Sequence, residues 1–254
     1  MNSPQHKIYF KSSENMSEVK NGVIKTIITS PPYWNLKNYL NEGQIGYKET
    51  YNKYLLRLEK VWEECFRVLK KDGSIWININ TRVYKKIPHV IPYDIIKSME
   101  KVGFFYKNCF MWHKPSGIPA PPNNLSDHFE YVLFFTKSKK DFRFNNEILW
   151  DDDYGLLNKG ELGNSWRIVK KAGSIGKKII HPAIYPKELV RRIILLSSIK
   201  NDIILDPFLG SGTTLIVSKE LQRGSIGYEL NNQEYRKLIE LRIGENLDNI
   251  NFYA

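Results

Sequence analysis

The stretch that decides the fold is Ile203-Ile204-Leu205-Asp206-Pro207-Phe208-Leu209-Gly210-Ser211-Gly212-Thr213-Thr214. Its apolar start predicts a buried strand that ends at Asp206, and a helix is expected over about 212–222. Between them, Gly210 and Gly212 allow a tight turn and leave no Cβ in the way of a ligand. Strand, turn and helix in this order build parallel sheets, which bind ligands at the carboxyl ends of their strands. The stretch therefore predicts an α/β protein with a ligand site beside Asp206.

Short apolar runs alternate with segments of helical period along the rest of the chain, which predicts a doubly wound, mostly parallel sheet. Further strands are expected at 7–10, 23–29, 75–79, 104–112, 130–136 and 225–229, and further helices at 49–70, 91–101, from Pro186 onward and at 231–244. Residues 137–180 are rich in Lys, Gly, Asn and Asp and hold few apolar runs, which indicates a loop-rich insertion on the surface. We therefore expect one domain in two halves, 1–136 and 181–254, separated by an insertion at 137–180.

The ligand expected beside Asp206 is an adenosine cofactor without a phosphate. Asp206 can accept a hydrogen bond from an ammonium group, and Glu229, at the end of the next strand, can accept both hydroxyls of a ribose. Turns that bind phosphate end in Gly-Lys-Ser/Thr or carry a third glycine, and this turn has neither feature.

A second motif, Thr29-Ser30-Pro31-Pro32-Tyr33, also follows a buried strand. It suits an exocyclic amino group of a base, which is a poor nucleophile because its lone pair is delocalised into the ring. The Ser30 hydroxyl and the carbonyl of Pro31 can accept the two amino hydrogens and direct the lone pair at an electrophilic methyl group. The prolines fix the backbone that carries this acceptor, and Tyr33 is expected to stack on the base. A base inside a duplex must be flipped out to reach such a pocket.

Composition excludes several other classes of protein. The 254 residues fit one α/β domain, and no apolar run is long enough to span a bilayer. The first residues lack the apolar stretch of a secretion signal, and two cysteines make a disulfide framework improbable, so a cytoplasmic location is expected. No metal site is expected, because Asp151-Asp152-Asp153 lacks ligand spacing around it. The net charge of +11 and the 13% aromatic content suit a polyanionic partner but do not require one.

The two motifs and their order resemble the amino-methyltransferases of restriction-modification systems, specifically the permuted beta group. The resemblance covers about residues 7–244. It implies a circularly permuted, seven-stranded Rossmann-like methyltransferase sheet, with the insertion as a target-recognition region, and S-adenosyl-L-methionine as cofactor. It implies that the catalytic residues are Ser30, Pro31, Pro32 and Tyr33. It further implies cofactor contacts from Ser12, Ser13, Thr29, His181, Pro182, Asp206, Phe208, Gly210, Ser211, Gly212, Thr213 and Glu229.

Two departures from the family pattern bear on function. Many relatives carry Gly-Asp after the first strand, where this chain has Lys11-Ser12-Ser13, so the contact with the cofactor's adenine differs. Serine at the first position of the second motif is typical of cytosine-N4 enzymes, whereas aspartate is typical of adenine-N6 enzymes. Ser30 therefore favours cytosine N4, with adenine N6, an amino group of RNA, or an inactive nucleic-acid-binding module as alternatives. Carbon-5 methylation is not expected, because it needs a reactive cysteine and both Cys65 and Cys109 have the pattern of core residues.

The implied substrate is double-stranded DNA, and basic residues in loops are expected to hold it. The expected DNA-binding residues are Trp34, Lys37, Arg82, Lys85, Lys86, Lys114, Lys139, Lys140, Arg143, Lys170, Lys171, Lys177 and Lys178. A cognate restriction endonuclease is a further expected partner, and the chain is expected to be a monomer or a homodimer.

Overall fold

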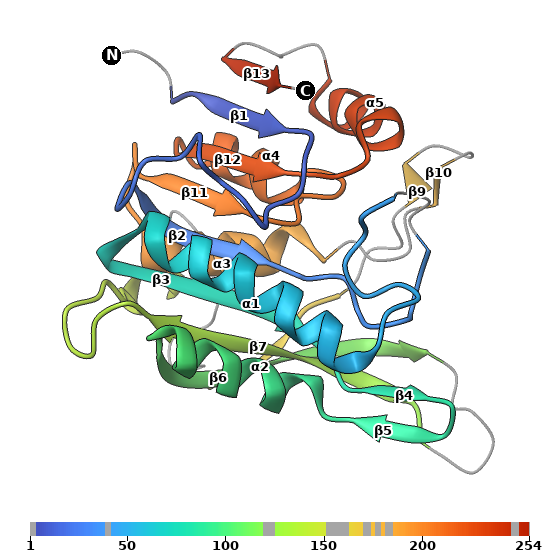
Figure 1. The fold of residues 1–254 in the computed structure, drawn as a ribbon. Coiled ribbons are helices and arrows are strands. Elements are labelled where there is room, and N and C mark those ends of the chain that lie inside the picture. The colour runs from blue at the N-terminus through green and yellow to red at the C-terminus, as the bar shows by residue number, and fades with distance from the viewer. Residues whose placement is uncertain are drawn as a thin grey trace.

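The computed structural model describes residues 4–38, 42–118, 125–150, 163–169, 174–175, 179–180, 185–244 and 249–253. Its centre is one sheet of nine strands, shown in Figure 1. The strands, in order across the sheet, are β13 (Ile250–Tyr253), β1 (His6–Tyr9), β12 (Gly224–Tyr228), β11 (Ile203–Asp206), β2 (Ile24–Thr29), β3 (Leu69–Ile79), β7 (Asp127–Thr136), β6 (Phe105–Ile118) and β8 (Ser165–Arg167). Two short hairpins, β4 (Arg82–Tyr84) with β5 (Ile87–His89) and β9 (Ser174–Ile175) with β10 (Ile179–Ile180), lie outside it.

Strand directions decide where a ligand site can form. Neighbouring strands are parallel from β13 through β1, β12, β11 and β2 to β3. Their carboxyl ends therefore meet at one edge of the sheet, here called the carboxyl edge; the opposite one is the amino edge. Strand β7 is antiparallel to both β3 and β6. The amino-terminal strand β1 lies between strands from the end of the chain, which is the circularly permuted order.

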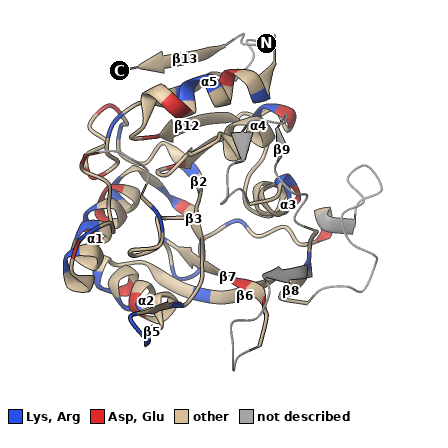
Figure 2. Cartoon of the chain, turned by 90° about the vertical axis from the view of Figure 1, so that its right-hand side faces the viewer, with Lys and Arg blue, Asp and Glu red and all other residues tan. Residues whose placement is uncertain are grey.

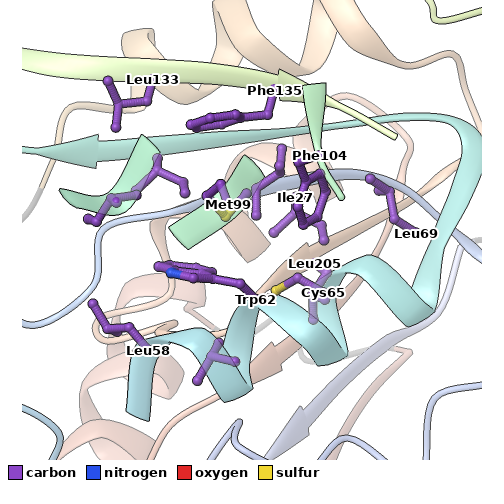
Figure 3. Close-up of a cluster of buried hydrophobic side chains, with 14 of the residues drawn as sticks. Ile27, Leu58, Trp62, Cys65, Leu69, Met99, Phe104, Leu133, Phe135 and Leu205 are labelled. Atoms are coloured by element: carbon purple, nitrogen blue, oxygen red, sulfur yellow. The ribbon is translucent and has the colours of Figure 1, made fainter. Parts of the chain in front are cut away.

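Five α-helices within the described residues cover the two faces of the sheet. In Figure 1, α1 (Tyr51–Val68) and α2 (Ile91–Val102) lie in front, whereas α3 (Lys187–Ser197) and α4 (Thr213–Glu220) lie behind. The apolar side of α1 buries Leu58, Trp62 and Cys65 against Ile27 and Leu205 of the sheet, as Figure 3 shows. On the other face, α3 and α4 pack against Trp76, and α5 (Asn232–Ile243) packs with α4 over β1. The sheet is therefore a buried central layer, as expected for a doubly wound fold.

Most elements agree with the sequence predictions to within a few residues. Helix α1 begins after Thr50, whose side chain accepts a hydrogen bond from the Lys53 amide, and α2 ends at Gly103 in the left-handed conformation. The seven expected strands form the middle of the sheet. One further strand is added on each side, β13 next to β1 and β8 next to β6, so the sheet has nine strands. The hairpin β4–β5 and strand β13 were not predicted, because each is short and lacks a strong apolar alternation.

The insertion at 137–180 is more than a surface loop. Its strand β8 pairs with β6 at the sheet edge, and Trp166 and Ile168 are buried in the core that α3 covers. The indole of Trp112 also donates a hydrogen bond to the Ile168 carbonyl. The described part of the insertion thus contributes to the core as well as to the surface, which sequence pattern does not reveal because these isolated apolar residues lie among polar ones.

Candidate functional site

The loop after β11 has the conformation that its glycines predict. Gly210 has a φ of +51° and Gly212 a φ of +79°, both in the left-handed region that other residues avoid. The Leu209 amide donates to the Tyr228 carbonyl (2.8 Å), which ties the loop to the neighbouring strand β12. The loop is thus held in place at the carboxyl edge, and a Cβ at Gly212 would meet Ile239 of α5 at 3.2 Å, so this glycine also allows the close packing of α5.

Asp206 lies beneath this loop and is fully buried. One of its carboxylate oxygens accepts hydrogen bonds from Tyr185 (2.6 Å) and Thr214 (2.7 Å), and the other accepts one from the Phe208 amide (3.1 Å). Burial raises the pKa of Asp206, and these hydrogen bonds oppose that rise. Both oxygens therefore already have hydrogen-bond partners within the protein. Asp206 holds the start of the loop through Phe208 and the start of α4 through Thr214, in addition to giving the site a negative charge.

Glu229 follows β12 directly and lies beside the same loop. Its carboxylate accepts two hydrogen bonds from backbone amides, one on each oxygen: from Gly210 (2.9 Å) and from Asn231 (2.9 Å). Burial raises the pKa of Glu229 to about 7, although these backbone hydrogen bonds lower it. The carboxylate is thus fixed in position at the carboxyl edge, as a ribose acceptor would have to be.

The second motif lies next to the first, because β2 pairs with β11 through Leu205 and Ile27. Thr29 and Pro31 are buried, whereas Ser30, Pro32 and Tyr33 are partly exposed. Two motifs far apart in the sequence are thus brought to adjacent strand ends.

Tyr33 belongs to a polar cluster that the sequence did not predict. Its hydroxyl donates a hydrogen bond to Oε2 of Glu130 on β7 (2.9 Å). The side-chain amide of Asn78 donates a hydrogen bond to the same Glu130 oxygen (2.7 Å). The second oxygen of Glu130 accepts the ammonium of Lys114 on β6 (3.2 Å). Burial and the charge of Glu130 raise the pKa of Tyr33 well above its usual range, and the neighbouring Ser30 hydroxyl opposes this rise. Tyr33 therefore stays protonated and can act as a donor.

Ser12 and Ser13 lie in the loop that follows β1. Ser13 is 3% exposed, and its hydroxyl has no hydrogen-bond partner among the described residues. Such an orphaned hydroxyl is costly unless something else bonds it. The Ser12 hydroxyl donates to Glu14, whose carboxylate also pairs with Arg57.

The basic residues expected to hold DNA are distributed over different surroundings. Lys85 and Lys86 are exposed at the tip of the β4–β5 hairpin, which follows β3 on the side of the carboxyl edge (Figure 2). Arg82 is partly buried and donates to the Asn35 carbonyl, and Lys37 is partly exposed in the loop after the second motif.

Two of the expected DNA-binding residues are inside the protein. Trp34 is 7% exposed, and its indole donates to the Glu49 carbonyl while its ring packs against Tyr51 and Tyr84. Lys114, only 8% exposed at its side chain, is held by Glu130. Trp34 therefore supports the hairpin from inside, and Lys114 belongs to the Tyr33 cluster.

Lys139, Lys140 and Arg143 lie far from the two motifs. Thr136, at the end of the antiparallel strand β7, pairs with Ser74 at the amino edge, so the residues that follow it leave the sheet on that side. The Asn145 amide then bonds the Leu196 carbonyl at the end of α3. The expectation that these three residues line the same surface as Ser30 is thus not met, because sequence pattern does not give the direction of β7.

Several expected residues lie outside the described part of the chain. These are Lys170, Lys171, Lys177, Lys178, His181 and Pro182, together with the acidic run Asp151-Asp152-Asp153. Among the described residues, no group of three or more His, Cys, Asp or Glu side chains is arranged to hold a metal ion. The described helices are also too short or too polar to cross a membrane.

The two cysteines have core surroundings. Cys65 is fully buried, and burial raises the pKa of its thiol well above the usual range. Cys109, on β6, is partly buried, and burial raises its pKa as well. Neither thiol is therefore poised as a thiolate nucleophile.

Three residues of the site escaped sequence reasoning: Tyr185, Asn78 and Glu130. Each acts through a contact with a residue distant in the sequence: Tyr185 is 21 positions from Asp206, and Glu130 is 97 positions from Tyr33. Asn78 and Glu130 were visible only as polar residues within apolar strands, which is a signal for a buried polar role. Tyr185 gave no signal beyond its place just before Pro186.

Comparisons with known proteins agree with this geometry. Residues 24–240 match the protein family described as DNA methylase. The type II methyltransferase M.MjaI of Methanocaldococcus jannaschii is 34% identical over 283 residues, covering 94% of this chain and 91% of that protein. The PvuII DNA methyltransferase (cytosine-N4-specific) has a similar structure, with a TM-score of 0.78 at 20% identity over 99% of this chain and 98% of that one. TTHA0409 of Thermus thermophilus, solved in complex with S-adenosyl-L-methionine, has a TM-score of 0.73 at 24% identity over 98% of both chains.

Proposed function

Because this chain belongs to the DNA methylase family, we propose that it transfers a methyl group from S-adenosyl-L-methionine to the N4 amino group of cytosine in double-stranded DNA. The observation that carries the proposal is Ser30, which directly follows β2, the strand that pairs with β11, and has the small hydroxyl typical of cytosine-N4 enzymes. The cytosine-N4 specificity of the PvuII enzyme, which has the same fold, supports this choice.

The cofactor assignment rests on the residues at the carboxyl edge. The turn at Gly210 and Gly212, at the carboxyl ends of the strands, suits the methionine part, and the fixed carboxylate of Glu229 suits the two ribose hydroxyls. The unpartnered hydroxyl of Ser13 suits the adenine, in place of the acidic residue of many relatives. The bound cofactor supplies a methyl group made electrophilic by its sulfonium. The structure of TTHA0409 with S-adenosyl-L-methionine supports this cofactor.

The chain's own residues then prepare the amino group of the base. The Ser30 hydroxyl oxygen and the Pro31 carbonyl accept the two amino hydrogens, which directs the nitrogen lone pair at the methyl group. Because those acceptors are fixed before the reaction, the positive charge that develops on nitrogen is stabilised without rearrangement. The target base has to leave the duplex to reach them.

The proposed DNA contacts come from the hairpin and the insertion. Lys37 follows the second motif along the chain, and the hairpin that carries Lys85 and Lys86 contacts Trp34 through Tyr84. The lysines at 170–178 belong to the expected target-recognition region. Phosphate contacts of this kind hold the duplex without reading its sequence. A cognate restriction endonuclease is part of the same proposal, since M.MjaI is a type II methyltransferase.

The test is to measure modified nucleosides in DNA from a host that lacks its own methyltransferases and expresses this chain. Mass spectrometry of the digested DNA is expected to find N4-methylcytosine, whereas N6-methyladenine alone would overturn the cytosine assignment in favour of adenine. Label from tritiated cofactor that enters RNA but not duplex DNA would favour an RNA substrate. In the same host, Ser30→Ala should reduce the modification by about a hundredfold or more. Cofactor binding by that variant, measured by calorimetry, should stay within about twofold of wild type, because the serine contacts the base.

A further inference from the structure

Arg57 of α1 holds together two loops that border the proposed site, and neither sequence motif includes it. One loop follows β1, and its residues 10–23 are called here the β1 loop. The other follows the second motif, and its described residues, 34–38 and 42–50, are called here the β2 loop. Strands β12 and β11 lie between β1 and β2 in the sheet, so strand pairing alone does not bring the two loops into contact.

The guanidinium of Arg57 makes five hydrogen bonds, which is as many as it has N–H groups. In the β1 loop, its Nε and Nη2 donate to the two carboxylate oxygens of Glu14. In the β2 loop, Nη2 also donates to the Gly43 carbonyl (2.7 Å), and Nη1 donates to the Gln44 carbonyl (3.1 Å) and the Glu49 carboxylate (2.9 Å). A rigid fork of donors thus bonds both loops at once, which the single ammonium of a lysine could not do.

The β1 loop carries the residues expected to contact the cofactor's adenine. The Glu14 carboxylate that Arg57 holds also accepts the Ser12 hydroxyl (3.1 Å). Glu14 directly follows Ser13, whose buried hydroxyl has no hydrogen-bond partner among the described residues. Arg57 therefore fixes the part of the chain that presents both serines.

The β2 loop continues from the second motif. The carboxylate oxygen of Glu49 that does not face Arg57 accepts the Gly46 amide (2.9 Å). The Gly46 carbonyl in turn accepts the amide of Asn35 (2.6 Å), which is two positions after Tyr33. The indole of Trp34 also donates to the Glu49 carbonyl (2.9 Å). The bonds from Arg57 thus reach the chain directly beside the residues proposed to hold the base.

We propose that Arg57 is a positioning residue, which sets the β1 loop and the β2 loop at the spacing that brings the cofactor's methyl group within reach of the target base. The side chains of Arg57, Glu14 and Glu49 are only 17%, 20% and 9% exposed. Ion pairs removed from water in this way add little net stability, because desolvation offsets their attraction, but they favour one geometry. A misplacement of about 1 Å can slow a reaction about a hundredfold. The inference rests on the proposed amino-methylation.

The first test is Arg57→Lys, which keeps the positive charge and removes the fork. Cofactor affinity, measured by calorimetry, is expected to fall about fivefold or more, because the β1 loop is released. The single-turnover rate of methyl transfer at saturating cofactor and DNA should also fall about tenfold or more, because the loops lose their spacing. An effect on affinity alone would overturn the proposal that Arg57 sets the spacing.

Glu14→Gln and Glu49→Gln separate the two ends of the bridge. Glu14→Gln should weaken cofactor affinity by more than it lowers the saturated rate, because it releases the adenine side. Glu49→Gln should lower the saturated rate by more than it weakens cofactor affinity, because it releases the base side. The same ratio of the two effects in both variants would mean a general loss of structure and would contradict the inference.

Arg67→Lys is the matched control. Arg67 lies ten positions further along α1, pairs with Glu64 and donates to the carbonyls of Met16 and Val19. It therefore clamps the β1 loop to the same helix without contacting the β2 loop. Its variant should keep the saturated rate of wild type within about twofold. Equal losses of this rate in Arg57→Lys and Arg67→Lys would overturn the role of Arg57.

Thermal unfolding of each variant is measured in parallel. If Arg57→Lys does not fold, the opposite patterns expected of Glu14→Gln and Glu49→Gln decide, since each keeps the bonds at the other end of the bridge. A wild-type protein that binds the cofactor but transfers no label to any amino group of DNA would instead refute the proposed function.

Discussion

At the scale of single residues, the proposed contact of Glu229 with the cofactor predicts that cofactor binding depends on pH. Burial raises its pKa to about 7, from the ordinary value of 4.5 that applies in the unfolded chain. Folding therefore binds a proton between these values, and the stability that this group contributes is present below pH 4.5 and lost as the pH rises through about 7. The proposed contact with the cofactor has the opposite requirement, because only the ionised carboxylate of Glu229 would accept both ribose hydroxyls.

We therefore expect the affinity for S-adenosyl-L-methionine to fall as the pH drops below about 7, by up to about tenfold per pH unit. Calorimetric titrations between pH 5.5 and 8.5 measure this, and Glu229→Gln is the control. The glutamine variant should bind more weakly at pH 8 and show a flatter pH dependence, although Asp206 and the cofactor's own amine still titrate. Parallel pH curves for the two proteins would assign the effect to those other groups.

At the scale of elements, the β4–β5 hairpin is built to expose two positive charges. Its turn residues Lys85 and Lys86 have φ values of +49° and +65°, a conformation that glycine or asparagine adopts more readily. The hairpin is supported from inside by Trp34, which packs against Tyr84 and His89. Two lysines thus occupy an unfavourable backbone conformation at the exposed tip. Strained residues of this kind are often functional, and this supports a role for both lysines in binding DNA.

Replacing both residues, Lys85→Asn and Lys86→Asn, should weaken DNA binding and leave the hairpin intact, because asparagine tolerates this backbone. If each lysine contacts one phosphate, the salt dependence of log affinity should become shallower by about two. Fluorescence anisotropy with labelled duplex at several salt concentrations measures this. The matched variant with Lys139→Asn and Lys140→Asn removes two charges from the amino edge. It should bind like wild type, and an equal loss in both variants would argue for a general charge effect.

The elements also show where sequence reasoning succeeds and where it fails. Asp206, Gly210, Gly212 and Ser30 were predictable, because each belongs to a local motif whose conformation follows from strand, proline and glycine chemistry. The position of Lys139 was not, because it depends on the antiparallel direction of β7. Glu130 could not be assigned to Tyr33 for the same reason: partners on different strands are set by the order of the whole sheet, which no local pattern contains.

At the scale of the whole molecule, both halves of the chain contribute neighbouring strands, and this determines how the protein folds. Strand β11 of the carboxyl-terminal half pairs with β2, and β1 of the amino-terminal half lies between β12 and β13. Helix α3 also covers Trp76 and Trp166, which belong to the preceding part of the chain. Neither half can therefore close its core or satisfy its strand edges alone.

We predict that fragments 1–169 and 170–254, expressed separately, each lack cooperative thermal unfolding and bind no S-adenosyl-L-methionine. Expressed together, they should associate and recover cofactor binding, because the broken connection lies outside the sheet's central pairings. Circular dichroism melts and calorimetry check both statements, with the intact chain as reference. A fragment that unfolds cooperatively near the transition of the intact protein would mean that the halves are separate domains. In the intact protein, the pairing of β11 with β2 places the glycine loop of one half beside Ser30 of the other. If each half folded alone, this pairing would not be needed for folding, and the site would be an interface between two domains.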